Sequence, residues 1–193
     1  MDKIIEKNIL AIEPVYIKDK GNCTRVYTEK NEDIAIHKTI RTVINNICKY
    51  YHFDLKESKK TYGGLLNLKK FPPIPFNSDN VFIYIKMRKP RCIHDGAYGY
   101  VKLDEIYKLK EEKDNTTKIY LRNGNKIKSL STINTINKRI NNGRTVKQLS
   151  KGKDNRVIKE NESYYIDKDE LATKKDIALI YMEMMKIKNI IKE

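Results

Sequence analysis

Three of the five prolines in this chain fall within the six residues Phe71-Pro72-Pro73-Ile74-Pro75-Phe76. Proline has a fixed φ angle and no backbone N–H, so this run excludes a helix or an interior strand. It predicts an extended connection between two regular elements. At 193 residues the chain is long enough for one domain with its own core and a helical appendage at one end.

The segments on either side of this connection have different apolar periodicities. Before it, apolar residues recur at helical spacing from Ile40 to Tyr51, and Thr39 is a suitable N-cap. After it, apolar residues alternate over 81–87, which is the period of a strand. The chain therefore contains a helix, then an extended linker, then a strand.

Several further stretches predict strands, among them Cys23–Thr28 and Tyr98–Leu103. Ile9–Ile17 is apolar but contains Pro14, so it is expected to be a strand edge or two short strands. Asn123-Gly124 lies between Thr116–Arg122 and Asn125–Leu130, and this pair suits the positive φ angles of a type I′ turn. The two segments and the turn between them therefore predict a β-hairpin.

The C-terminal half shows two helical patterns. Isoleucines at 133, 136 and 140 predict a short helix that stops at Gly143, followed by a flexible basic loop over 143–159. Thr173–Asp176 resembles a capping box and predicts a helix that runs to about Ile191. Periodicity fades over 54–70, where no regular element is predicted.

Together these elements predict an α+β fold with antiparallel strands and two to three helices, including a C-terminal helix. The expected division is an α+β domain over 1–159 and a C-terminal helical segment over 160–193 that packs on the core, joins protomers, or does both.

The net charge of +15 is concentrated in two blocks. Residues 38–102 hold 13 basic and 4 acidic residues, and residues 118–159 hold 12 basic and 1 acidic residue. Near-neutral pieces separate and flank the blocks. This distribution indicates one basic face built from two stretches of chain, and it favours a polyanionic partner.

The three cysteines, Cys23, Cys48 and Cys92, are far apart and include no CxxC pair. This spacing argues against a disulfide scaffold or a zinc ribbon, so we expect neither a metal nor a cofactor. No apolar run approaches the ~20 residues that span a bilayer, so we expect no membrane partner. The protein is expected in the cytoplasm, associated with the nucleoid.

Several runs resemble the ComK family in their order and spacing: Asn46–Tyr51, Pro72–Pro75, Asn80–Met87, Arg91-Cys92, and the hairpin around Asn123-Gly124. The resemblance covers about residues 23–185. The ComK family consists of DNA-binding transcription factors that switch on competence for transformation in low-GC Gram-positive bacteria. One departure lies at His52–Lys59, where family members carry a small-residue run that resembles Gly-Ser-Ser-Tyr, so the chain is expected to be a divergent member.

The resemblance implies a transcriptional activator of DNA-uptake genes that binds paired AT-rich boxes as a dimer or a pair of dimers, largely through the minor groove. Narrow A-tract grooves attract inserted Arg and Lys. The predicted contacts are a turn stiffened by Pro90, the pair before Phe71, and the second basic block. They comprise Arg88, Lys89 and Arg91; Lys69 and Lys70; and Lys138, Arg139, Arg144, Lys147, Lys151, Lys153 and Arg156.

The terminal helix carries a wide apolar stripe that predicts core packing, self-association, or both. The residues assigned to self-association are Ile177, Ile180, Tyr181, Met184 and Met185. The resemblance also implies a proteolytic adaptor as a partner, for which Tyr164–Ile166 is the candidate docking segment.

Two other classes of function stay open. A nucleic-acid-processing enzyme would need a catalytic cluster, but the neighbours in His94-Asp95-Gly96 point to opposite faces of an extended chain, so no catalytic residue is assigned. The acidic pairs Asp104-Glu105 and Glu111-Glu112 are expected in an exposed helical stretch. A non-specific RNA or single-strand binder would need aromatic residues among the bases, and the candidates are Tyr84, Tyr98 and Tyr100.

Overall fold

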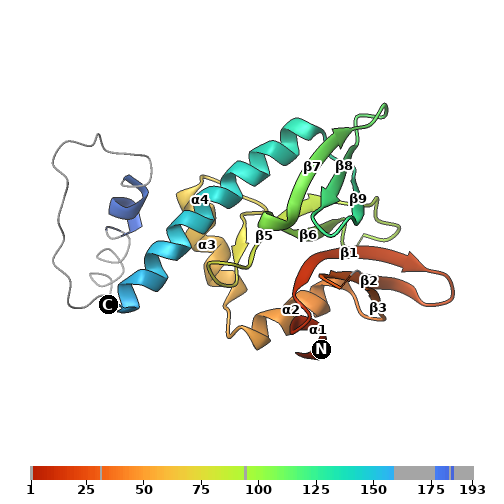
Figure 1. Ribbon diagram of the computed structural model, residues 1–193, viewed down its shortest axis with the longest axis horizontal. Coiled ribbons are helices and arrows are strands. Elements are labelled where there is room, and N and C mark those ends of the chain that lie inside the picture. Colours follow the sequence, from red (N-terminus) through yellow and green to blue (C-terminus); the bar gives the residue numbers. More distant parts are fainter. Residues whose placement is uncertain (1, 31, 94, 159–176, 183, 185–193) are drawn as a thin grey trace.

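A computed structural model describes residues 2–30, 32–93, 95–158, 177–182 and 184, with only the backbone described at Asp2 and over 152–158. The architecture is α+β, and every strand pairing in it is antiparallel, as predicted (Figure 1). The elements in chain order are α1 (Asp2–Ile5), β1 (Ile9–Ile17), β2 (Gly21–Thr28), β3 (Asp33–Ile36), α2 (Ile40–Tyr50), α3 (Leu55–Leu65), β4 (Ile74–Pro75), β5 (Val81–Lys86), β6 (Tyr98–Lys102), the 3₁₀ turn η1 (Leu103–Glu105), β7 (Ile106–Glu111), β8 (Thr117–Leu121), β9 (Lys126–Ser129) and α4 (Ile133–Ile158).

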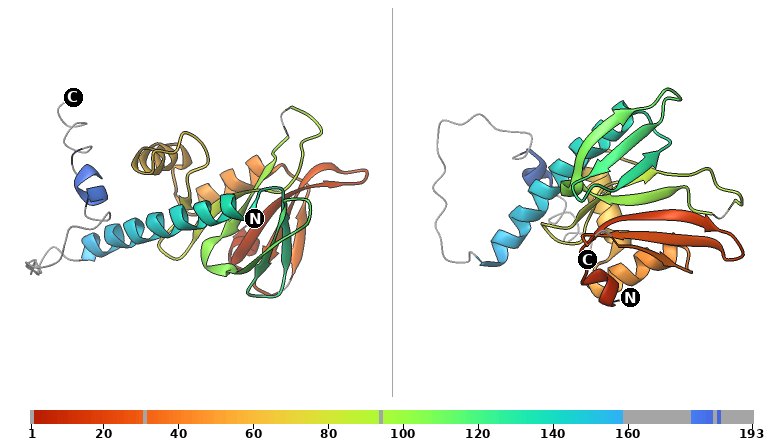
Figure 2. Two further views of the ribbon diagram at one scale, coloured as in Figure 1. Left: turned by 90° about the horizontal axis from the view of Figure 1, so that it is seen from above. Right: turned by 45° about the vertical axis from the view of Figure 1, so that its right-hand side comes forward.

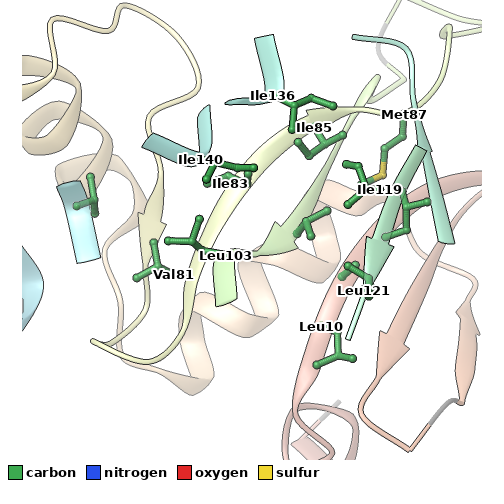
Figure 3. Packing of buried hydrophobic residues seen from close by; sticks show 14 of the residues in the cluster. Leu10, Val81, Ile83, Ile85, Met87, Leu103, Ile119, Leu121, Ile136 and Ile140 are labelled. Carbon is green, nitrogen blue, oxygen red and sulfur yellow. The ribbon is translucent and has the colours of Figure 1, made fainter. Parts of the chain in front are cut away.

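The larger sheet has six strands in the order β3-β2-β1-β6-β5-β4, and it is covered on both faces. Alternate side chains of β5 enter different cores. Ile83 and Ile85 pack toward α4 (Figure 3), whereas Phe82 and Tyr84 belong to the core on the α2 side. Burial on both faces explains why all of β5 is apolar up to Lys86.

The smaller sheet, in the order β7-β8-β9, packs over the α4 side of the larger one (Figure 2). Ile119, Leu121 and Ile127 from this sheet join the same core as β5. Backbone contacts also connect the two sheets, since the Leu130 N–H donates to the Lys86 carbonyl over 2.7 Å. The smaller sheet and α4 are therefore held to one surface of the larger sheet.

The strongest local patterns produced the elements they predict. Thr39 caps α2, and its hydroxyl accepts the Thr42 N–H over 3.4 Å. The proline-rich run supplies only the two-residue edge strand β4. Ile9–Ile17 is one strand rather than two. Pro14 is tolerated there because β6 pairs with β1 only at Ala11 and Ile12, which leaves that side of β1 open at Pro14.

The predicted end of the fourth helix at Gly143 is wrong, because α4 continues to Ile158. Gly143 is buried where α4 crosses β5, and a Cβ atom there would lie 2.8 Å from Cγ2 of Ile83. The glycine permits close approach of the helix to the strand and does not end the helix. The residues assigned to a flexible basic loop, 143–158, are helical.

Two other local predictions are wrong. Glu111 lies in strand β7, paired with β8, and not in a helix; Asp104-Glu105 forms the 3₁₀ turn before it. The hairpin turn is not type I′, because only Gly124 has a positive φ, at 86°. The Leu121 N–H donates to the Asn125 carbonyl over 2.9 Å, so the loop has three residues and ends in a left-handed glycine.

Helix α3 formed where the sequence showed no periodicity. Asp54 caps it by accepting the N–H groups of Lys56 and Glu57 over 2.8 and 2.9 Å. The helix buries only Tyr62 and Gly63, which explains the weak apolar pattern. None of the helices in the described ranges is long and apolar enough to cross a membrane.

The described part of the terminal segment, 177–182 and 184, is helical and has two different faces. Met182 is only 9% exposed and joins the core on the α4 side, with Ala178 and Leu179 packed against the same core. Four of the residues assigned to self-association are exposed: Ile177, Ile180, Tyr181 and Met184. Met185, the capping box at 173–176 and Tyr164–Ile166 lie outside the described residues.

Candidate nucleic-acid interface

Most of the candidate basic residues lie on two structural units, and Lys69-Lys70 lies in the connection between α3 and β4. The first is the β5–β6 loop, residues 87–97, which holds Arg88, Lys89 and Arg91. The second is the outer face of α4 together with the strands beside its N-terminal half. They correspond to the two basic blocks of the sequence.

The β5–β6 loop is fastened to the β1–β2 hairpin through Tyr16. The guanidinium carbons of Arg88 and Arg91 lie 4.0 and 4.5 Å from the centre of the Tyr16 ring. The Tyr16 hydroxyl accepts the Arg91 N–H over 2.7 Å and donates to the Asp95 carboxylate. Cation–π contact and hydrogen bonding thus hold both ends of the loop against one side chain.

Arg88 takes part in this anchor and is not a free surface cation. Its Nε donates to the Gly96 carbonyl over 2.8 Å, and its Nη2 donates to Oδ1 of Asn22 over 2.7 Å. The Asn22 amide in turn donates to Asp95 over 2.8 Å. Hydrogen bonds, first of all the one from Tyr16, lower the pKa of Asp95 below its usual value, so the loop contains an ionised carboxylate that is already satisfied.

Lys89 and Arg91 are the cations of this loop that face solvent, and Ile93 beyond them is 93% exposed. The cations were predicted as contacts because they cluster at a strand end. Ile93 was not predicted, because the sequence contains no sign that an isolated isoleucine in a polar loop would be excluded from the core.

The Lys69-Lys70 pair is exposed. The next residue, Phe71, belongs to an aromatic cluster that contacts Arg139 in the first half of α4. The Phe71 ring stacks on Tyr98 with 4.0 Å between centroids. The Arg139 guanidinium carbon lies 5.3 Å from the centre of the Tyr98 ring, and its Nη1 donates to the Tyr84 carbonyl over 2.5 Å. Arg139 therefore joins α4 to the larger sheet and is largely occupied there.

The outer face of α4 is polar and carries no carboxylate up to Lys151. It combines amides, which can both donate and accept, with cations. The exposed residues of this face are Asn134, Asn137, Lys138, Asn141, Arg144, Thr145, Gln148 and Lys151. Lys153 and Arg156 lie further along α4, where side chains are outside the described part of the chain.

A groove of about 720 Å³ lies between α4 and β7. Five cations line it, Lys108, Arg122, Arg144, Lys147 and Lys151, together with the amides of Asn137, Asn141 and Gln148 and with Tyr107. The single carboxylate in its lining is Asp104, which is paired with Lys147. This α4–β7 groove is therefore positively charged and rich in hydrogen-bonding groups, which suits a sugar–phosphate backbone.

Lys108, Arg122 and Tyr107 were missed by the sequence reasoning. Tyr107 and Lys108 belong to β7, which was expected to be helical, and Arg122 belongs to the hairpin loop. Tyr107 is 71% exposed, whereas Tyr84 and Tyr100 are buried and Tyr98 is stacked on Phe71. The three tyrosines suggested as a base-stacking platform therefore serve the core and its edge.

Comparison with known proteins gives one match. A family model described as ComK protein matches residues 2–155, which include the whole larger sheet, the smaller sheet and nearly all of α4. No curated protein and no solved structure matches the chain.

Proposed function

Because the chain belongs to the ComK family of competence transcription factors, which is not a family of enzymes, we propose that it activates DNA-uptake genes by binding AT-rich double-stranded DNA. In this proposal it acts in the cytoplasm, at the nucleoid. It contacts DNA mainly through the minor groove and needs no metal or cofactor.

The observation that carries this proposal is the outer face of α4, which carries no carboxylate up to Lys151, beside the α4–β7 groove. Five cations and one carboxylate line that groove, and the carboxylate is already paired with Lys147. Each phosphate that such a surface neutralises releases counterions and strengthens binding at low salt. The amides interspersed along α4 can bond to sugar and phosphate oxygens or to base edges.

The β5–β6 loop supplies the contact suited to a minor groove. Lys89 and Arg91 are exposed on a loop whose carboxylate, that of Asp95, already accepts a hydrogen bond from the Tyr16 hydroxyl. Narrow A·T-rich grooves attract such cations through their enhanced negative potential. The donor and acceptor pattern in that groove distinguishes A·T from G·C and little else, which fits recognition of AT-rich boxes by shape.

Assembly on paired boxes would come from the exposed side of the terminal helix. Met182 packs into the core, while Ile177, Ile180 and Met184 on the same helix are exposed. One helix can thus be fixed to its own protomer and still offer an apolar face to a second copy. A two-fold dimer would present two DNA-binding surfaces in fixed register.

The test uses one AT-rich and one GC-rich duplex of equal length, with binding measured at several salt concentrations. We expect tighter binding to the AT-rich duplex and a steep loss of affinity with salt. Replacing Arg144 and Lys151 together with alanine should reduce the slope of log affinity against log salt by about 1.8, or ~0.9 per lost phosphate contact.

The matched control replaces Arg41 and Lys49, an exposed arginine and an exposed lysine of α2 on the other side of the larger sheet. It removes the same net charge, so a slope that stays at the wild-type value would localise the contact to α4. Equal loss of slope in both double variants, or equal affinity for both duplexes, would contradict the proposal.

A further inference from the structure

The β5–β6 loop presents a large apolar side chain to solvent at its outermost turn. Ile93 is 93% exposed, more than any other large apolar residue in the described part of the chain. Resting on the proposed function, we propose that Ile93 is a wedge residue that enters the minor groove and partly unstacks one base step.

Ile93 is placed at the apex of a tight turn. The Asp95 N–H donates to the Cys92 carbonyl over 3.0 Å, and the Cys92 N–H donates back to the Asp95 carboxylate over 3.3 Å. Ile93 follows Cys92 directly in this turn. Its side chain is almost fully exposed at this turn, so it is accessible to a DNA groove.

Hydrogen bonds and cation–π contacts fasten this turn to the β1–β2 hairpin, as a wedge requires. Tyr16 receives the Arg91 N–H, donates to Asp95, and stacks against two guanidinium groups. Asn22 connects Asp95 to Arg88 through two further hydrogen bonds. An apolar residue on a flexible loop would move aside when pressed against a base stack, whereas this turn is fixed to the β1–β2 hairpin.

The charge around the turn fits DNA better than an apolar protein partner. Lys89 and Arg91 precede Ile93 and are exposed, and the nearby carboxylate of Asp95 is occupied by Tyr16 and Asn22. Architectural proteins that bind the minor groove combine cations with an inserted Phe, Leu, Ile, Met or Pro, and the insertion kinks the duplex. Single exposed apolar residues are common, so it is this combination of apex position, attachment to the β1–β2 hairpin and flanking cations that carries the inference.

The test measures affinity and bending together, using the full chain and an AT-rich duplex of about 30 base pairs with a fluorophore at each end. We expect the wild-type protein to bring the ends closer. Ile93→Ala should weaken binding by about tenfold and reduce the bend, because the inserted group is lost. Its salt slope should stay unchanged, because no phosphate contact is removed.

Two variants keep the result interpretable. Ile93→Leu retains an apolar wedge and should bend DNA like the wild type, whereas Tyr50→Ala removes an exposed aromatic residue from α2 and should change neither affinity nor bend. Ile93→Ala that binds and bends like the wild type would overturn the wedge, and so would wild-type binding without bending. Absence of wild-type binding to the duplex would instead overturn the proposed function.

Discussion

Replacing Gly143 with alanine tests the closest approach between α4 and the larger sheet. Gly143 lies inside the helix, and the Cβ atom of an alanine there would lie 2.8 Å from Cγ2 of Ile83 and 3.2 Å from Cδ1 of Leu103. Ile83 is 1% exposed and belongs to an interior strand of the sheet. Its Cγ2 methyl is attached directly to the β-carbon, so it cannot swing away as the end of a long side chain can.

Two effects of opposite sign determine the free energy of unfolding of this variant. Alanine is favoured over glycine in a helix interior by about 1 kcal/mol. Overpacking a core that cannot relax costs about 1–3 kcal/mol. The net expectation is a destabilisation of up to about 2 kcal/mol, which for a domain of this size lowers the Tm by about 4–8 °C at the upper limit.

The matched control is Gly64→Ala in α3, where a Cβ atom meets nothing within 4 Å. Only the propensity effect acts there, so we expect this variant to be more stable by about 0.5–1 kcal/mol. Urea unfolding followed by circular dichroism measures both. If Gly143→Ala were stabilised as much as Gly64→Ala, the close contact with Ile83 would have no energetic weight and our explanation for the continuous α4 would fail.

Three further predictions concern other contacts. Arg88→Ala should lower the free energy of unfolding, measured by urea titration, by about 1–3 kcal/mol, because the Gly96 carbonyl and Asn22 lose their hydrogen-bond donor. Lys89→Ala, at an exposed position, should change the free energy of unfolding by less than ~0.5 kcal/mol. The hydrogen bond from Thr116 is the main cause that lowers the pKa of Asp114 to about 2. The ionised Asp114 should therefore stabilise the fold fully above its unfolded pKa of ~3.9, and this stabilisation should be lost as the pH falls through about 2. An ordinary pKa for Asp114 in a carboxyl titration by NMR would contradict this. Met182→Ala should destabilise the protein by about 2 kcal/mol, the lower part of the range for replacing a buried methionine by alanine. If this variant instead unfolds at the same temperature as the wild type, the terminal helix does not contribute to the core.

Local chemistry in the sequence determined the elements whose signals need no distant partner. Thr39 predicted the start of α2 because its hydroxyl caps a neighbouring N–H. The alternation over 81–87 predicted β5, and the proline-rich run predicted that only an edge position was open to it. The two basic blocks indicated one basic face built from two stretches of chain; in the structure their cations lie on the β5–β6 loop and on α4, and a single continuous face stays a prediction.

Tertiary structure decided which of those cations are available. Arg88 is bonded to Asn22, 66 residues away, and Arg139 is bonded to the Tyr84 carbonyl, 55 residues away, so both serve the framework. The residues next to Arg88 and Arg139 in the sequence do not indicate these partners. Lys108 faces the α4–β7 groove only because β7 pairs with β8 beside α4.

The same reason accounts for Gly143. By itself, a glycine after an apolar helical run predicts a helix end, because it has no side chain to lose and adopts a left-handed φ readily. In the folded chain Ile83 and Leu103 occupy the space where a side chain would lie, and their packing holds the helix against the sheet. A local pattern states what a residue can do, and the residues that the fold brings against it determine which possibility has the lowest free energy.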